Sequence, residues 1–84
     1  MNDLLRARIR KTFQDGDLIR VSERSGKAKS VTWYAAGGDP VFEHDDVVEA
    51  LGRDHRCTMR LVTHLKLTDG FILEQRVLPQ GASN

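Results

Sequence analysis

The sequence predicts a small α+β domain, in which two hairpins form a largely antiparallel four-stranded sheet, with an N-terminal helix and a short helix between the hairpins. Three observations lead to this prediction. The chain has 84 residues, which suits one domain with a modest core. Two pairs of segments alternate between apolar and polar residues around turn signals, and two others repeat apolar residues at helical spacing. We expect residues 1–79 to form the domain and residues 80–84 a flexible tail.

The first helix is expected over residues 4–14. Leu5, Ile9 and Phe13 lie four apart on one helix face, and Asn2 can cap the start. The same segment also alternates between apolar residues and arginines, so a further strand is the alternative. That strand would leave apolar sheet surface uncovered and would favour a homodimer. Helix propensity and the cap favour the helix.

The first hairpin is expected to pair residues 18–24 with residues 30–35, because Ser25-Gly26-Lys27 lies between them as a turn. Alternation within each segment predicts which side chains point toward the core. The inward set is Ile19, Val21, Val31, Trp33 and Ala35. Two glycines and a proline at 37–40 then interrupt the sheet.

A short helix is expected over residues 45–51, where Asp45 can cap and Gly52 can end the helix. The second hairpin follows, with strands over 57–68 and 71–77 joined by Asp69-Gly70. Alternation along its first strand predicts one apolar face. That face would consist of Cys57, Met59, Leu61, Leu65 and Leu67.

The charge of the chain is unevenly distributed. The net charge is +1, which argues against a strongly basic histone-like protein and against an acidic tail protein. Residues 1–30 hold eight basic and four acidic residues (+4), residues 31–54 one and six (−5), and residues 55–84 four and two (+2). Two basic flanks therefore enclose an acidic middle.

The basic flanks suggest a nucleic-acid surface on the outward face of the sheet. Cations can neutralise phosphates there, and an aromatic ring among them can stack on a base. The residues in the predicted outward register are Arg20, Arg24, Tyr34, Arg60, His64, Lys66 and Arg76. Our first functional hypothesis is therefore a non-catalytic binding module that docks on nucleic acid or on a nucleoprotein complex.

The acidic middle suggests the alternative function. A small inhibitor or adaptor of the anti-CRISPR kind could dock an acidic segment on a basic protein partner. The candidate partner-binding residues are Asp39, Glu43, Asp45, Asp46, Glu49 and Asp54. Helix capping and solubility are the simpler explanation for several of these acids.

No catalytic, metal or cofactor motif is evident, so we expect neither an enzyme nor a cofactor. His55 and Cys57 form one close pair of metal-ligand types, whereas tetrahedral zinc usually needs two. A hydrolase-type site at His44 or His55, each next to an aspartate, is kept as an alternative. A single cysteine and the lack of a long apolar run at the amino terminus lead us to expect a cytoplasmic protein without a membrane partner.

Residues 42–52, Phe-Glu-His-Asp-Asp-Val-Val-Glu-Ala-Leu-Gly, resemble one element of a known family. The Bro-N domain of prophage antirepressors similarly has an aromatic residue before an Asp-Val pair and a helix that ends Ala-Leu-Gly. The resemblance implies a phage or mobile-element origin and transfers no functional residue. After Gly52 the sequence departs from the family, because it alternates like a strand where the family has a further helix.

Overall fold

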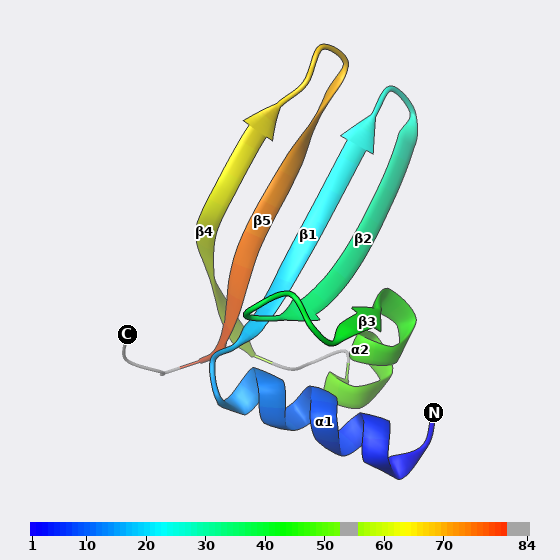
Figure 1. Ribbon diagram of the computed structural model, residues 1–84, viewed down its shortest axis with the longest axis vertical. Coiled ribbons are helices and arrows are strands. Elements are labelled where there is room, and N and C mark those ends of the chain that lie inside the picture. The colour runs from blue at the N-terminus through cyan, green and yellow to red at the C-terminus, as the bar shows by residue number, and fades with distance from the viewer. Residues whose placement is uncertain (53–55, 81–84) are drawn as a thin grey trace.

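A computed structural model describes residues 1–52 and 56–80 of the chain. Its elements follow the order helix, three strands, helix, two strands (Figure 1). They are α1 (Asp3–Gln14), β1 (Leu18–Ser25), β2 (Ala28–Ala35), β3 (Val41–Glu43), α2 (His44–Leu51), β4 (Cys57–Lys66) and β5 (Gly70–Pro79). The expected tail lies outside the described residues, apart from Gln80.

The strands form one antiparallel sheet in the order β3-β2-β1-β5-β4, which confirms the predicted α+β class with two helices. The sheet has five strands, so the expectation of four omits one. The additional strand, β3, has only three residues, and its Phe42 pairs with Trp33 of β2. Three residues are too few to reveal an alternating pattern in the sequence.

The first segment is a helix, as its propensity and cap predict. The Leu5 amide donates to the Asn2 side-chain oxygen at 2.7 Å, which satisfies one free amide of the first turn. Ile9 and Phe13 are buried on the face that the four-residue spacing predicts. The strand alternative for residues 4–14 is therefore excluded.

The second helix begins earlier than expected, at His44. Glu43 occupies the N-cap position without a side-chain capping bond, so the prediction that Asp45 caps this helix is wrong. Asp45 instead lies within the first turn, where its negative charge interacts favourably with the positive end of the helix dipole. The Arg10 side chain of α1 contacts α2 by donating a hydrogen bond to the Ala50 carbonyl at 2.9 Å.

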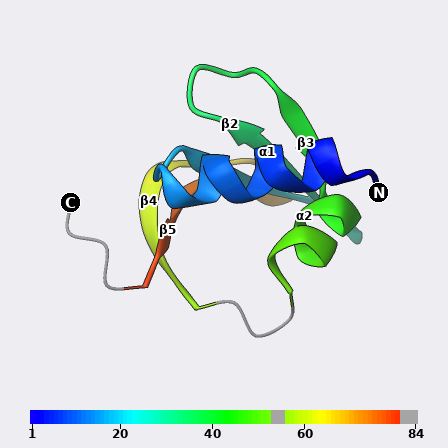
Figure 2. The ribbon, with the colours of Figure 1, turned by 90° about the horizontal axis from the view of Figure 1, so that it is seen from below.

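Both helices lie at one end of the sheet, and the two hairpin turns point away from them (Figure 1). Seen from below, α1 crosses the strand ends with α2 beside it (Figure 2). The core joins side chains of both helices to four residues at this end of the sheet. Its buried members are Ile9, Phe13, Leu18, Trp33, Phe42, Val47, Ala50 and Val77. We call the face that carries Leu18, Trp33 and Val77 the helix-side face.

The pairing of β1 with β2 changes the faces predicted for the first hairpin. Because a two-residue turn makes Ser25 and Ala28 partners, Ile19 pairs with Tyr34 and Arg20 pairs with Trp33. Directly paired residues share a face of the sheet. Ile19 and Val21 therefore lie opposite to the helix-side face, so the prediction that they point inward with Trp33 is wrong.

A β-bulge changes the faces of the second hairpin. The pairing of β4 with β5 shifts between Leu61 and Thr63, so Val62 is an extra residue. Beyond the bulge the alternation inverts: His64 and Lys66 pair with Leu73 and Phe71 on the helix-side face. Leu65 pairs with Ile72 on the opposite face, away from Met59 and Leu61. The single apolar face predicted for β4 is therefore wrong.

Candidate nucleic-acid interface

Beyond the helices, the helix-side face carries a group of cations with no acidic residue among the described residues of that register. Arg24 pairs with Lys29 across β1 and β2, and Lys66 pairs with Phe71 across β4 and β5. Each of these charged side chains is exposed. We call these cations, together with His64 and the ring of Phe71, the arm surface. Its members are Arg20, Arg24, Lys29, His64, Lys66 and Phe71.

Phe71 is the aromatic centre of the arm surface. It is half-buried, with Arg24 directly opposite on β1 and Lys66 directly opposite on β4. The His64 ring meets it edge-on, with 6.1 Å between ring centroids. The Phe71 ring thus has Arg24 on one side and Lys66 and His64 on the other.

Arg20 joins the arm surface to the core. Its guanidinium lies over the Trp33 ring at 5.9 Å from the centroid and donates to the Ser22 hydroxyl. Both contacts hold the side chain in place on the helix-side face. A shallow depression of about 200 Å³ lies beside Arg20, between β1, β2 and Phe71, and Glu23 contributes to its lining.

The seven residues predicted for one nucleic-acid face are divided between two faces. Arg20, Arg24, His64 and Lys66 lie on the arm surface, for the reasons of register given above. The other three lie on the opposite face: Tyr34, Arg60 and Arg76. The prediction of a single face is therefore wrong, because the length of the first hairpin turn puts Arg20 and Arg24 on the helix-side face and the β-bulge puts His64 and Lys66 there.

The opposite face is mixed in charge. Tyr34 hydrogen-bonds to Glu74, and Glu23 lies on the same face because it pairs with Ser30 and Ile72. Burial, this hydrogen bond and the negative charge of Glu74 together raise the pKa of Tyr34 from 10.0 to about 12. Its phenol is therefore engaged within the protein. The carboxylates also weaken the attraction of this face for phosphates.

Two residues of the arm surface, Lys29 and Phe71, were missed from the sequence. The position of Lys29 opposite Arg24 could not be predicted, because it depends on the length of the hairpin turn. Phe71 lies in a strand whose alternation of apolar and polar residues is typical of a core position. The two-residue turn at Gly26-Lys27 is the signal that would have found Lys29, because it pairs Arg24 with that lysine.

The acidic candidates that the structure describes lie in α2 or in the segment that leads into it, and some have structural roles. Asp45 and Asp46 occupy its first turn, and Glu49 lies 3.8 Å from the Arg6 guanidinium. Asp39 is exposed in the loop before β3, and Glu43 is exposed at the end of that strand. Asp54 lies outside the described residues.

The histidine proposed for catalysis has a structural contact. The Trp33 indole N–H donates to His44 Nδ1 at 3.0 Å, which satisfies a donor whose residue is buried. His55 lies outside the described residues. Within residues 1–52 and 56–80, no three side chains of metal-ligand type converge on a common point.

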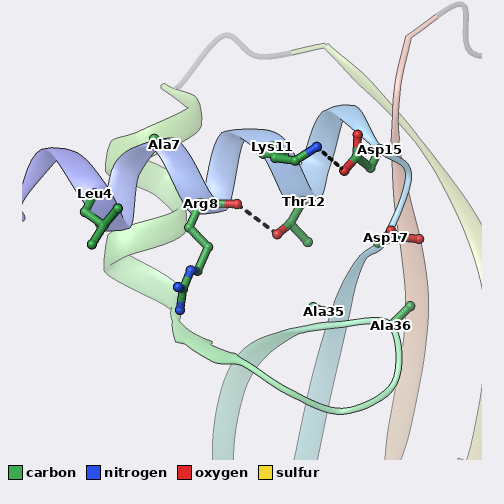
Figure 3. A pocket seen from close by; sticks show the side chains of 9 residues that line it. All are labelled: Leu4, Ala7, Arg8, Lys11, Thr12, Asp15, Asp17, Ala35 and Ala36. Carbon is green, nitrogen blue, oxygen red and sulfur yellow. Dashed lines mark hydrogen bonds and ion pairs between the residues drawn. The ribbon is translucent and has the colours of Figure 1, made fainter.

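A larger hollow of about 390 Å³ lies between α1 and the end of β2 (Figure 3). Three of its polar side chains already have partners on or next to α1: Lys11 lies 3.0 Å from Asp15, and the Thr12 hydroxyl donates to the Arg8 carbonyl. The hollow is open and also lined by Leu4 and two alanines. This arrangement shows no convergent polar groups of a ligand site.

Neither helix of the described chain has the length and apolar character needed to cross a membrane. Comparisons with family models, with characterised proteins and with solved structures find no match for this chain.

Proposed function

We propose that this protein is a non-catalytic module that binds single-stranded nucleic acid on the arm surface. The observation that carries the proposal is that Arg24 and Lys66 lie on either side of the half-buried ring of Phe71, with Lys29 next to Arg24 and no acidic residue in that register. An antiparallel sheet face with cations and an aromatic ring suits a splayed strand, whose phosphates are neutralised while an unpaired base stacks.

The shape of the fold supports a single strand over a duplex. The arms, residues 20–30 and 61–75, extend away from the helices, which leaves the strand face open along its length (Figure 1). Side chains of a sheet face reach the bases of an unpaired strand directly, whereas a duplex stacks its bases inside. The Arg20–Trp33 contact fixes one edge of this surface and reduces the ordering needed on binding.

Fluorescence-anisotropy titrations with single-stranded DNA and RNA at two or more salt concentrations test the proposal. With four fixed cations on the arm surface, we expect the logarithm of affinity to fall with the logarithm of salt at a slope of about −3. Arg24→Glu with Lys29→Glu should weaken binding at least about tenfold and make the slope shallower.

The matched control is Arg8→Glu with Lys11→Glu, which changes the net charge equally but on α1. Both residues are exposed at the far end of the molecule, so binding should change far less. Phe71→Leu tests stacking separately: affinity should fall while the salt slope stays unchanged. Equal losses in the two charge-reversed proteins, or tighter binding of duplex than of single strands, would refute the assignment.

A further inference from the structure

The outer edge of β4 is a long, exposed sheet edge. β4 is the last strand in the sheet order and has ten residues, whereas the strand at the other edge, β3, has three. Most of β4 is exposed, including Leu61 at 60%, Val62 at 49% and Leu65 at 51%. Proteins usually shorten, cover, charge or bulge such an edge because it can pair with another strand, and β4 has both charges and a bulge, which restrict the strands that can pair with it.

The backbone of β4 has groups available on this edge. The Leu67 amide donates to the Gly70 carbonyl, so this residue directs its backbone groups toward β5. Because backbone groups alternate along an antiparallel strand, those of His64 and Lys66 point to the outer edge. In the part of the chain that the structure describes, no strand pairs with that edge.

The charge of β4 indicates what can pair there. Cys57–Lys66 contains Arg60, His64 and Lys66 but no acidic residue. Arg60 lies on the opposite face before the bulge, whereas Lys66 lies on the helix-side face after it. A second copy of β4 would bring the same cations and no acid, so its charges do not complement this edge.

From this edge we infer an interaction surface: β4 binds an extended segment of another protein as a sixth strand, apolar in the middle and acidic toward both ends. Acidic side chains of that segment lie opposite Arg60 and Lys66, and apolar ones lie opposite Leu61 and Leu65. Backbone hydrogen bonds supply affinity, and the cations select the acidic segment. This inference does not rest on nucleic-acid binding, although Lys66 belongs to both surfaces: the segment pairs with the backbone edge of β4, whereas the nucleic acid lies on the sheet face.

Two short synthetic peptides provide the test. One consists of valine and threonine with a glutamate near each end, and the other has lysines in place of the glutamates. Titrated into the isotope-labelled full-length protein, the glutamate peptide should shift backbone amide signals of β4 and slow the exchange of the His64 and Lys66 amides. It should bind at least about tenfold more tightly than the lysine peptide.

A charge-swapped protein, Arg60→Glu with Lys66→Glu, provides the matched control. It should prefer the lysine peptide, which shows that a loss of glutamate-peptide binding does not come from unfolding. Equal binding of both peptides, shifts confined to the sheet face, or no binding at millimolar peptide would overturn the inference. A dimer formed through β4 in the absence of peptide, seen by sedimentation and removed in the charge-swapped protein, would also overturn it. Nucleic-acid binding by Arg24 and Lys29 can succeed or fail independently of each of these outcomes.

Discussion

The two ends of the sheet differ in what stabilises them. At the end of the sheet next to the helices, side chains of the helices and of the strands are buried against each other. The arms, residues 20–30 and 61–75, extend from this end without a covering element (Figure 1). Every buried hydrophobic residue of the described chain lies outside the arms. The arms instead hold the arm surface and the free edge of β4. The buried core at the helix end of the sheet, which we call the base, therefore stabilises the fold, and the arms present side chains for binding.

The largest contrast should come from the same substitution made at each end. Leu18 is fully buried in the base, and Leu61 is 60% exposed in an arm. Leu18→Ala should lower the free energy of unfolding by about 2–5 kcal/mol because it leaves a cavity. Leu61→Ala should change it by no more than about 0.5 kcal/mol. Urea unfolding of both variants measures the difference, and equal losses would contradict the division.

The two arms approach each other closely at Gly70, near their tips, because this residue has no Cβ. A Cβ at Gly70 would lie 1.7 Å from the backbone carbonyl oxygen of Arg24, so the strands would have to separate there. We expect Gly70→Ala to cost about 1–3 kcal/mol of unfolding free energy. Amide shift changes should concentrate at the tips of β1 and β5. An unchanged urea midpoint would show that the arms are not held together at this contact.

Removing the hydrogen bond between Trp33 and His44 tests how much an unsatisfied indole N–H destabilises the base. His44→Ala removes the acceptor of the Trp33 indole N–H, whose residue is only 4% exposed. We expect a loss of about 1–2 kcal/mol in unfolding free energy. His44→Asn retains an acceptor oxygen and should lose less. Fluorescence of the single tryptophan follows both unfolding transitions, and equal losses would show that the hydrogen bond is not the cause.

The smallest expected effect is a pH dependence at Tyr34. Its pKa is raised from 10.0 to about 12, so the folded protein holds the phenol proton more tightly than the unfolded chain. The resulting stability is fully present below pH 10 and is lost as pH rises through about 12. The chain has one tyrosine, so phenolate absorbance reports on it alone. Glu74→Gln should lower the pKa, and a folded-state midpoint at 10.0 would contradict this account.

Local signals in the sequence predicted much of the fold. The Asn2 cap and the spacing of Ile9 and Phe13 located α1, and turn residues located both hairpins. The three-residue strand β3 escaped because it forms by pairing with β2, which is a tertiary event. Strand positions thus followed from local pattern, but the number of strands did not.

The candidate site was harder to predict because it depends on which face each side chain occupies. One extra residue, Val62, moves His64 and Lys66 to the helix-side face, and nothing in the local pattern marks a bulge there. The first hairpin similarly needed its turn length before Arg20 could be placed beside Trp33. Residue types suggested cations near an aromatic ring, whereas register decided which cations and which ring. The binding role of these residues stays a prediction.

The most direct test of the arm surface is to map amide shifts when a single-stranded oligonucleotide is added to the isotope-labelled protein at low salt. The account predicts that shifts concentrate at Arg24, Lys29, Lys66 and Phe71, while the exposed residues of α1 stay unchanged. Shifts centred on α1 or on the opposite face at Arg76, with the arms unaffected, would contradict it.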